Sequence, residues 1–515
     1  MKKLFAVLFG LLLFANVANA TTYYVTSTAC NAMASDTNNG TSISTPWAST
    51  AKVNSSTYST DIVEFQSGCS LTGKLTTSAS LTTYGGTAQA QIVGSGSDYA
   101  YDNNSQNFFL SNIDFENTGY SAARIGAFYQ NITSGTITGA KFGITGGTSS
   151  NYPLYFQASG YSIGNVSVTN TEITDPSAGN TVEIYHSAAK VYNFTFSNDN
   201  IHDSANAGIT IISPSESDTT SGSYYPYGFQ INYNNFSNLK TQGAVNFTTG
   251  MFGTPSPCSV SNNIVTNIGS SASPNVNAFQ LEYMNGCTVN GNNINGIVTS
   301  APDGDGIEID WAWADITKLS NNNTVCYNTI TGATSGVTSS GIRMYAGTNN
   351  NVCYNLTYGN TTGISNPNSF TSGNVYDHNT MVYNQNGGGV DGLSGSGVAS
   401  TWTNNIFGFN VNFGFKVSNN FTPPTESNND WYGNGTANIY NYSTSTPIAI
   451  NSSDLTLNPL FVNAASNNYT LTAFSPMIGA GTRTTGNYQY IGNRDITGFS
   501  NNGALTDLGA FTWRP

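Results

Sequence analysis

The segments "NAFQLEY" at residues 277–283 and "DGIEIDW" at residues 305–311 alternate apolar with polar side chains. Period-two alternation is typical of a β-strand with one buried face. The pattern recurs at intervals of 22 to 36 residues, as "TVEIYH" from Thr181, "AGITII" from Ala207, "GAVNFT" from Gly243, "SGIRMY" from Ser340 and "TGIS" from Thr362. A recurring unit of this length indicates a solenoid.

The apolar residues of these segments align into two columns that we expect to point inward. The first column is Val182, Ile209, Val245, Phe279, Ile307, Ile342 and Ile364, and the second is Ile184, Ile211, Phe247, Leu281, Ile309 and Met344. A second apolar strand follows each segment and ends in a turn such as "SNNI" or "GNNI". We expect the asparagines to stack in a ladder, to adopt the left-handed conformation and to bond their own backbone.

Stacked coils with strands in parallel register predict an all-β fold, a single-stranded right-handed parallel β-helix with N- and C-terminal capping segments. A β-propeller is the alternative, but the units are too short and variable for four-stranded blades. We predict that the chain is divided into four segments: a signal peptide at 1–20, an N-terminal cap with the first coils at 21–100, the coils that carry the groove at 101–430, and the last coils with a C-terminal cap at 431–515.

The chain resembles the pectate-lyase-like right-handed parallel β-helix superfamily of bacterial polysaccharide lyases and glycoside hydrolases. Beyond the repeat, "YYVTSTACNAMASDTNNGTSISTPWAST" at 23–50 looks like the entry segment that caps such helices. The stretch "LNPLFVNAASNNYTLTAFSPMIGAGT" at 457–482, followed by "DLGAF" at 507–511, resembles their exit segment. The superfamily includes lyases, hydrolases, epimerases, tailspikes and adhesins, so the resemblance implies the fold more narrowly than the activity.

The first residues predict export. Lys2 and Lys3 precede an apolar run, which ends at Ala18-Asn19-Ala20, a small-residue cleavage site. The run is too short to span a membrane, and no later segment is apolar for long enough. We therefore expect a secreted, periplasmic or cell-surface protein without a membrane span in the mature chain.

Charge is scarce in this sequence. Only 8% of residues are charged, and the net charge is −13. Nucleic-acid binding is excluded, because it requires a basic surface that displaces counterions. A strongly anionic polysaccharide is disfavoured without being excluded, since mobile cations or a basic groove could compensate. The sequence leaves open whether the protein is a monomer or a trimer.

Six cysteines remain in an exported chain, where disulfides persist. We expect a Cys30–Cys69 bridge across the N-terminal segment. Cys258 with Cys287, and Cys326 with Cys353, open matching stretches of adjacent coils, about 4.8 Å apart, which a disulfide can span. Alternation places Cys326 and Cys353 in the inward column of Val260 and Val289, so unbridged cysteines stacked as small apolar residues remain an alternative.

The residues between the inward columns should face solvent. They form one column of Glu183, Thr210, Asn246, Gln280, Glu308, Arg343 and Ser365, and another of Tyr185, Ile212, Thr248, Glu282, Asp310 and Tyr345. Three consecutive coils thus place six polar residues on one patch: Gln280, Glu282, Glu308, Asp310, Arg343 and Tyr345. So dense a cluster is conspicuous in a chain with so few charges.

The carboxylates of this patch predict acid–base chemistry. Glu282 and Asp310 are cross-strand neighbours, and crowding of like charges should raise the pKa of at least one. A protonated acid beside a carboxylate is what glycoside hydrolysis needs, with Glu308, Asp310 and Glu282 as candidates. Arg343 would pair with Glu308 or hold a substrate anion, while Gln280 and Tyr345 orient the substrate. The alternative is a solubilising surface with a weak Glu308–Arg343 pair.

The segments around the patch add further candidates. Asp303 and Asp305 lie in "PDGDG", a turn sequence that could also supply calcium ligands, although it lacks the spacing of an EF-hand loop. We expect that the protein requires no cofactor, and Ca²⁺ is the only metal that the sequence suggests. Continued alternation would point the Trp311 side chain inward, unless a turn after the strand interrupts the alternation. Trp311, Trp313 and Tyr225 would either stack on a sugar in a loop-walled groove or cover the coil beneath.

These observations favour an exported carbohydrate-active enzyme that hydrolyses glycosidic bonds of a polysaccharide or oligosaccharide. The resemblance implies an alternative, a calcium-dependent lyase or epimerase of a uronate polymer with Arg343 as the base. A non-catalytic adhesin or glycan-binding surface protein is the alternative outside enzymology.

Overall fold

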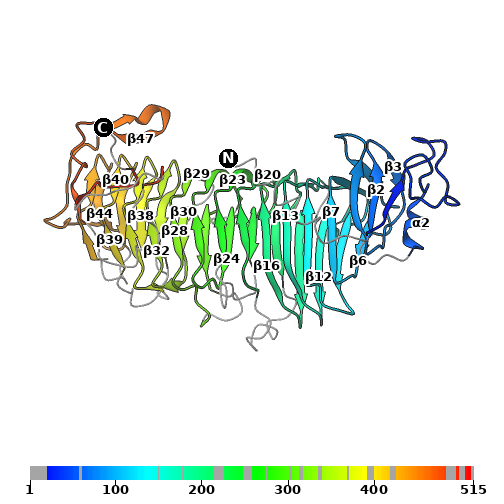
Figure 1. Ribbon diagram of the computed structural model, residues 1–515. Coiled ribbons are helices and arrows are strands. Elements are labelled where there is room, and N and C mark those ends of the chain that lie inside the picture. The colour runs from blue at the N-terminus through cyan, green and yellow to red at the C-terminus, as the bar shows by residue number, and fades with distance from the viewer. Residues whose placement is uncertain are drawn as a thin grey trace.

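The protein is an elongated parallel β-solenoid in a computed structural model, as Figure 1 shows. The structure describes residues 20–56, 61–148, 150–176, 179–212, 226–247, 258–273, 275–300, 304–311, 317–334, 339–367, 371–390, 400–417, 425–482, 495–497 and 505–511. The predicted signal peptide lies almost entirely outside these residues. In the described part, no helix is long and apolar enough to cross a membrane.

Three long sheets run the length of the solenoid. Sheet A has 15 strands, from β1 (Thr22–Val25) to β42 (Thr425–Ser427), and sheet B has 14, from β3 (Ser70–Thr72) to β43 (Asp430–Tyr432). All their pairings are parallel, which is consistent with the predicted right-handed β-helix and excludes a propeller of antiparallel blades.

Sheet C carries the residues of interest and also has 14 strands. In spatial order they are β6 (Tyr101–Asn103), β9 (Ala123–Ala127), β12 (Leu154–Ser159), β15 (Val182–Ser187), β18 (Ile209–Ile212), β21 (Val245–Phe247), β24 (Phe279–Glu282), β27 (Ile307–Asp310), β30 (Ser340–Met344), β34 (Thr362–Ser365), β38 (Asn386–Val390), β41 (Phe413–Val417), β44 (Ala437–Asn441) and β45 (Thr446–Ile448).

Each coil contains three strands, whereas the sequence pattern suggested two. In one coil, β15 of sheet C leads to β16 (Val191–Ser197) of sheet A and then to β17 (Asn200–His202) of sheet B. The third strand was missed because β17 is only three residues long and starts inside the asparagine-rich turn. Three-residue strands give too few alternations to reveal a period.

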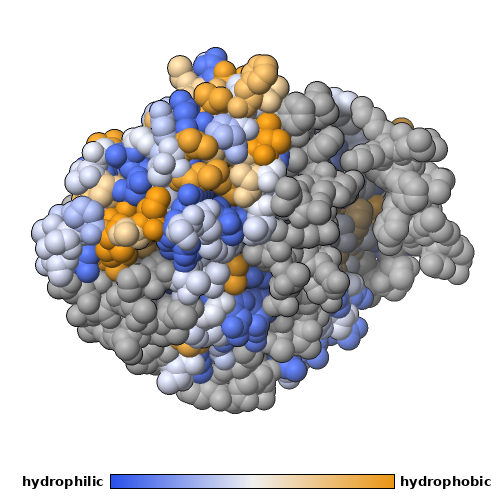
Figure 2. All heavy atoms as spheres, turned by 90° about the vertical axis from the view of Figure 1, so that its left-hand side faces the viewer, coloured by the Kyte–Doolittle hydropathy of each residue, from blue (hydrophilic) through white to orange (hydrophobic). Residues whose placement is uncertain are grey.

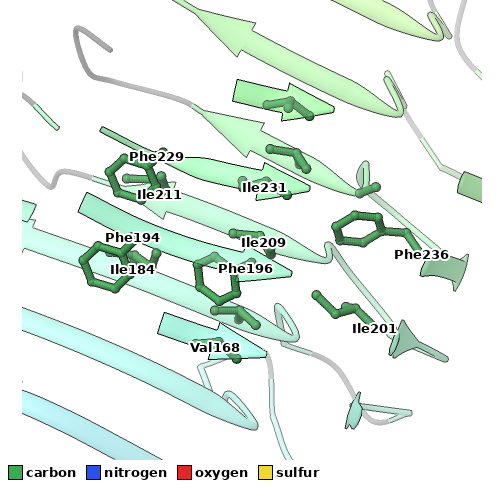
Figure 3. Close-up of a cluster of buried hydrophobic side chains, with 14 of the residues drawn as sticks. Val168, Ile184, Phe194, Phe196, Ile201, Ile209, Ile211, Phe229, Ile231 and Phe236 are labelled. Atoms are coloured by element: carbon green, nitrogen blue, oxygen red, sulfur yellow. The ribbon is translucent and has the colours of Figure 1, made fainter. Parts of the chain in front are cut away.

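The predicted inward columns form the core, and their register is as predicted. Val182 pairs with Ile209, Ile209 with Val245, and Phe279 with Ile307, and these side chains are fully buried. Figure 3 shows such side chains converging from the three sheets. Phe194 and Phe229 stack with ring centroids 5.3 Å apart. Each fully buried apolar side chain of this size stabilises the fold by about 1.5–3 kcal/mol.

An asparagine ladder lines the corner between sheets A and B. The backbone N–H and side-chain Nδ2 of Asn263 both donate to Asn292 Oδ1, at 3.0 Å each. The pattern repeats through the ladder residues, Asn234, Asn263, Asn292, Asn328, Asn355, Asn379, Asn405 and Asn429. We predicted that these asparagines bond their own backbone, but they mainly bond the coils on either side, as Asn263 Nδ2 does with Ile231 O of the preceding coil at 2.8 Å. Asn328 also bonds its own turn, at Cys326 O, 3.1 Å away.

The left-handed conformation belongs to the residue before each ladder asparagine. Asn262, Tyr327 and Tyr354 have φ values of 57°, 62° and 51°. The sharp turn therefore falls one residue before the ladder. The ladder side chain is then free to point into the corner and meet its counterpart on the next coil.

Segments outside the regular coils lie near both ends of the solenoid. At the N-terminal end, α2 (Thr50–Asn54) is capped by Ser49, whose Oγ accepts from the Lys52 N–H at 3.1 Å. Near the C-terminal end, the antiparallel β46 (Phe461–Asn463) and β47 (Asn468–Leu471) lie outside the coils. Figure 2 looks onto this end, where apolar residues reach the surface between polar ones, and Phe474 is 88% exposed.

Three disulfides join the cysteine pairs considered from the sequence, Cys30–Cys69, Cys258–Cys287 and Cys326–Cys353. The predicted inward position of the last pair is wrong. Val289 pairs with Val325, so Cys326 lies one residue later, beside Asn290. Cys326 and Cys353 consequently pack outside the main core, with Tyr354 and Tyr327.

Candidate active site

The strand register brings together six of the predicted site residues. Gln280 pairs with Glu308, Glu282 with Asp310, and Glu308 with Arg343. These residues lie on β24, β27 and β30, three adjacent strands of sheet C, and Tyr345 directly follows β30. The period-two pattern predicted this grouping because every second side chain of a strand points to the same face.

Glycines allow these coils to approach closely just before the site. A Cβ on Gly306 would lie 2.5 Å from the carbonyl oxygen of Gly341, and one on Gly341 would lie 2.7 Å from that of Gly363. Both distances are shorter than a van der Waals contact. The glycines of "DGIEID" and "SGIRMY" therefore keep β27 and β30 in register where Glu308 and Arg343 must meet.

The patch is buried, and our prediction that its charged residues face solvent is wrong. Glu308, Asp310 and Arg343 are each 8% exposed, and Glu282 is 1% exposed. One reason is that aromatic rings pack over the outward face. Arg343 lies over the Tyr345 ring, with 4.5 Å from the guanidinium carbon to the centroid. A buried charge is costly unless it is paired, so this patch differs from a solubilising surface.

Arg343 is held between two carboxylates. Its Nη1 lies 3.3 Å from Asp305 Oδ2 and 3.9 Å from Glu308 Oε1. Asp305 is fully buried, and its Oδ1 accepts from the Ser340 N–H. Asp305 was considered as a catalyst or calcium ligand, and in the structure its two oxygens instead position Arg343 and the start of β30. Asp303 lies outside the described residues.

Asn277 is a site residue that the sequence analysis missed. Its Nδ2 donates to Glu308 Oε2, and its Oδ1 accepts from the Asp305 N–H at 2.9 Å. One buried amide thus fixes both the glutamate and the turn that carries Asp305. A signal was available, because Asn277 opens "NAFQLEY" as Asn180 opens "NTVEIYH", each three residues before the outward column.

Burial gives Asp310 an unusual acidity. It raises the pKa of Asp310 to about 7, against the lowering effects of the Trp311 N–H and of Arg343, while Asp305 raises it further. The Trp311 N–H donates to Asp310 Oδ1 at 2.7 Å. The sequence predicted a raised pKa from crowding by Glu282, whereas the dominant cause here is desolvation. Near neutral pH this carboxyl group can both give and take a proton.

The neighbouring polar groups are also bonded. Gln280 Nε2 donates to Glu282 Oε1 at 3.0 Å, which links two residues of the same strand. The described residues contain no group of three or more His, Cys, Asp or Glu side chains arranged to hold a metal ion. Asp305 would have to leave Arg343 before both of its oxygens could bind a cation.

Trp311 packs on the outward side. Its ring centroid lies 5.0 Å from that of Tyr345, tilted by 51°, and the residue is 8% exposed. The strand ends at Asp310, so the alternation of inward and outward side chains does not extend to Trp311. This is why Trp311 does not point inward, as we expected if a turn interrupts the alternation. Tyr345 is half-buried and offers part of its ring at the site. Trp313 and Tyr225 lie outside the described residues.

Taken together, these residues provide a carboxyl group that titrates near neutrality, a second carboxylate paired with a guanidinium, and an adjacent aromatic pair. General acid–base catalysis requires the first two, with a pKa near the working pH. Aromatic rings beside carboxyl groups are suited to contact the apolar faces and hydroxyls of a sugar.

No protein-family model matches the chain, and no curated protein matches it significantly. Among solved structures, it aligns with a complex of XylC with xylose at 9% identity and a TM-score of 0.47, covering 96% of this chain and 98% of that one. It also aligns with the GH136 lacto-N-biosidase from Eubacterium ramulus, at 12% identity and a TM-score of 0.35, covering 82% and 68%.

A PL6 alginate lyase in complex with a trisaccharide aligns at 12% identity and a TM-score of 0.38, covering 78% of this chain and 86% of that one. Likenesses this distant carry no argument about the activity of this chain. The fold rests on the hydrogen-bonded sheets of this chain, in which the strands of the three long sheets pair in parallel apart from the terminal β44–β45 pair.

Proposed function

We propose that the protein is an exported carbohydrate-active enzyme that hydrolyses glycosidic bonds, with Asp310 and Glu308 as its catalytic carboxyl groups. The observation that carries this proposal is the raised pKa of Asp310, about 7, beside a glutamate paired with Arg343. Two carboxyl groups in different environments divide the roles of acid and base.

Asp310 is the general acid in this proposal. Its proton passes to the glycosidic oxygen as the bond to the anomeric carbon breaks, so that the leaving sugar departs as a neutral alcohol. Glu308, bonded by Asn277 and close to Arg343, is the second carboxylate. It either takes a proton from the water molecule that attacks the anomeric carbon, or it attacks that carbon itself and water then releases the sugar from the enzyme. Glu282 and Gln280 orient Asp310 and the sugar hydroxyls from the neighbouring strand.

Hydrolysis is preferred to β-elimination because of the environment of Arg343. A base must be able to lose a proton, and a guanidinium between two carboxylates is held in its charged form. The lyase and adhesin alternatives therefore become outcomes of the same test.

The test is a panel of soluble polysaccharides incubated with the purified mature chain. We expect new reducing ends without the ultraviolet absorbance of an unsaturated sugar. Asp310→Asn and Glu308→Gln should each lower kcat by about 10²–10⁴-fold, the usual contribution of a general acid or base. Exposed Asn295, on the outer face of sheet B, gives the control variant Asn295→Ala.

Unsaturated products that fail to form in the presence of a chelator would establish the lyase. Full activity in both carboxyl variants would place the active site elsewhere. Binding without cleavage across the panel would establish the adhesin.

A further inference from the structure

A second carboxylate with an asparagine partner lies in the same column as Glu308. Asn180 Nδ2 donates to Glu183 Oε2 at 3.0 Å, and Asn180 Oδ1 accepts from Asn206 Nδ2 on the next coil at 2.7 Å. Glu183 and Glu308 are four strands apart in sheet C, through Thr210, Asn246 and Gln280. The spacing of parallel strands makes this about 19 Å along the axis of the solenoid.

Half-buried tyrosines surround this second carboxylate. Tyr155 is the cross-strand neighbour of Glu183, and Tyr152 donates a hydrogen bond to it. The rings of Tyr152 and Tyr155 lie 5.0 Å apart, and Tyr185 follows in the next outward position of β15. Half-buried tyrosines offer flat apolar faces with polar tips, the combination that suits a sugar ring.

The charges nearby favour an uncharged ligand. Glu183 has a raised pKa because of burial, with Asn180 and Tyr152 acting in the opposite direction. Towards the N-terminus of the same face, Lys74 and Arg124 both pair with Asp102, at 2.9 and 2.8 Å, and Lys74 also pairs with Asp98 at 3.1 Å. These cations are already compensated, so a ligand carboxylate would gain little from them and would be repelled by Glu183.

We propose that Tyr152, Tyr155 and Tyr185, together with Glu183, form a second binding subsite that takes uncharged sugar rings of a polymer lying along sheet C. This proposal rests on the proposed function and deepens it. The polymer crosses the strands from Glu183 towards Glu308, and its far end is held four coils from the bond that is cut. Short oligosaccharides reach one of the two sites, whereas longer chains reach both.

The experiment uses affinity electrophoresis of the mature chain in the Asp310→Asn background, which prevents cleavage of the gel polymer. The gels contain xylan, mannan or mixed-linkage β-glucan as neutral probes, or polygalacturonate as the anionic probe. We expect retardation by at least one neutral polymer, and Tyr155→Ala with Tyr185→Ala should weaken that affinity roughly three- to tenfold, the effect of losing aromatic contacts.

Tyr192→Ala is the matched control, because Tyr192 is a half-buried tyrosine of the same coil that lies on sheet A and stacks on Tyr227. It should leave the retardation unchanged. A melting curve checks the fold of each variant. Should the double variant unfold, the single variant Tyr185→Ala provides the same comparison.

The proposal is overturned if the tyrosine variants are retarded as strongly as the parent, or if no polymer retards the parent. It is also overturned if the variants lose their retardation by polygalacturonate and not by a neutral polymer. Failure of the proposed function looks different. In that case the chain that retains both carboxyl groups cleaves nothing, while tyrosine-dependent retardation by a neutral polymer persists.

Discussion

Buried polar side chains occur in two regions of this solenoid, and the two are built in opposite ways. At the corner between sheets A and B, each ladder amide has donors and acceptors in matching number, and its neighbours on adjacent coils satisfy both. On the outward face of sheet C, carboxyl groups stand beside one another with a single guanidinium between them.

The difference teaches what burial does to a polar group. In the ladder, burial strengthens hydrogen bonds that are already complete, which stabilises the fold. In the patch, burial opposes ionisation and raises the pKa of Asp310 to about 7, so that this carboxyl group can exchange a proton near neutral pH.

The largest effect on stability should come from breaking the ladder in the middle. Asn328 donates to Asn355 Oδ1 at 3.0 Å and to Val289 O at 2.8 Å, and accepts from the Asn292 N–H at 3.0 Å. Asn328→Ala leaves these groups buried without partners and should cost about 3 kcal/mol. Urea unfolding followed by circular dichroism measures this cost.

The exposed Asn295 lies on the preceding coil, where it pairs with Thr331 of β29 (Thr329–Ala333), and Asn295→Ala should change the free energy of unfolding by less than about 0.5 kcal/mol. The turnover of the folded Asn328→Ala protein should stay within twofold of the parent. A loss of stability no larger than that of Asn295→Ala would contradict the structural role of the ladder.

An asparagine at the patch should behave differently. Asn277→Ala removes the amide that positions Glu308 and should lower kcat about 10- to 100-fold, or about 1.4–2.7 kcal/mol, with little change in KM. Steady-state kinetics on a cleaved polysaccharide measures the split. Asn235→Ala, an exposed amide on sheet B, is the control. A rise in KM alone would mean that Asn277 binds substrate rather than positioning Glu308.

The pH dependence of activity tests the raised pKa of Asp310. An acid whose folded-state pKa is about 7 is protonated below that pH and loses its proton above it. We expect kcat/KM to fall as the pH rises above about 7, approaching tenfold per pH unit. Residual activity of Asp310→Asn should lack this limb. A parent profile that is flat to pH 9 would exclude Asp310 as the acid.

Asp199 extends the ladder by one coil with an acid in place of an amide, since its N–H donates to Asn234 Oδ1 at 2.9 Å. Asp199 is 2% exposed, and burial raises its pKa to about 8, although the N–H groups of Thr171 and Ser197 lower it. A raised folded-state pKa stabilises the protein below the ordinary pKa of the acid, and this stabilisation is lost as the pH rises through 8.

Asp199→Asn should therefore stabilise the protein more at pH 9 than at pH 5, because an amide is neutral at both pH values whereas the buried aspartate is forced to ionise as the pH rises. Thermal unfolding at the two pH values measures the difference. An equal gain at both would show that hydrogen bonding matters here and ionisation does not.

The fold was predictable from the sequence where the pattern was regular. Columns such as Val182–Ile209–Val245 follow from period-two alternation, and fixing them also fixed the outward neighbours Glu308 and Arg343. The third strand was hardest to predict where it is short, since a three-residue strand such as β17 contains too little alternation. The predicted register of Cys326 was wrong by one residue for the same reason, because its strand has only three residues.

The candidate site was predictable in its grouping and less so in its environment. Alternation states which way a side chain points but not what packs over it, so the burial of Glu282 and Glu308 could not be inferred. The role of Asn277 depends on a contact between coils, which a single strand does not reveal. Asp305 looked like a turn residue, and its pairing with Arg343 spans 38 residues of sequence.

The ladder also has a direction. At each step the backbone N–H and one Nδ2 hydrogen donate to the next coil, whereas the other Nδ2 hydrogen donates to a carbonyl oxygen of the preceding coil. The backbone N–H dipoles of the ladder therefore align as peptide dipoles do in an α-helix. The carboxylate of Asp454 accepts from Asn429 at the positive end, at 2.9 Å, and the raised pKa of Asp199 favours a neutral acid at the negative end. The solenoid thus has an electrical polarity along its axis, so a coil grafted at one end must supply acceptors and a coil grafted at the other must supply donors.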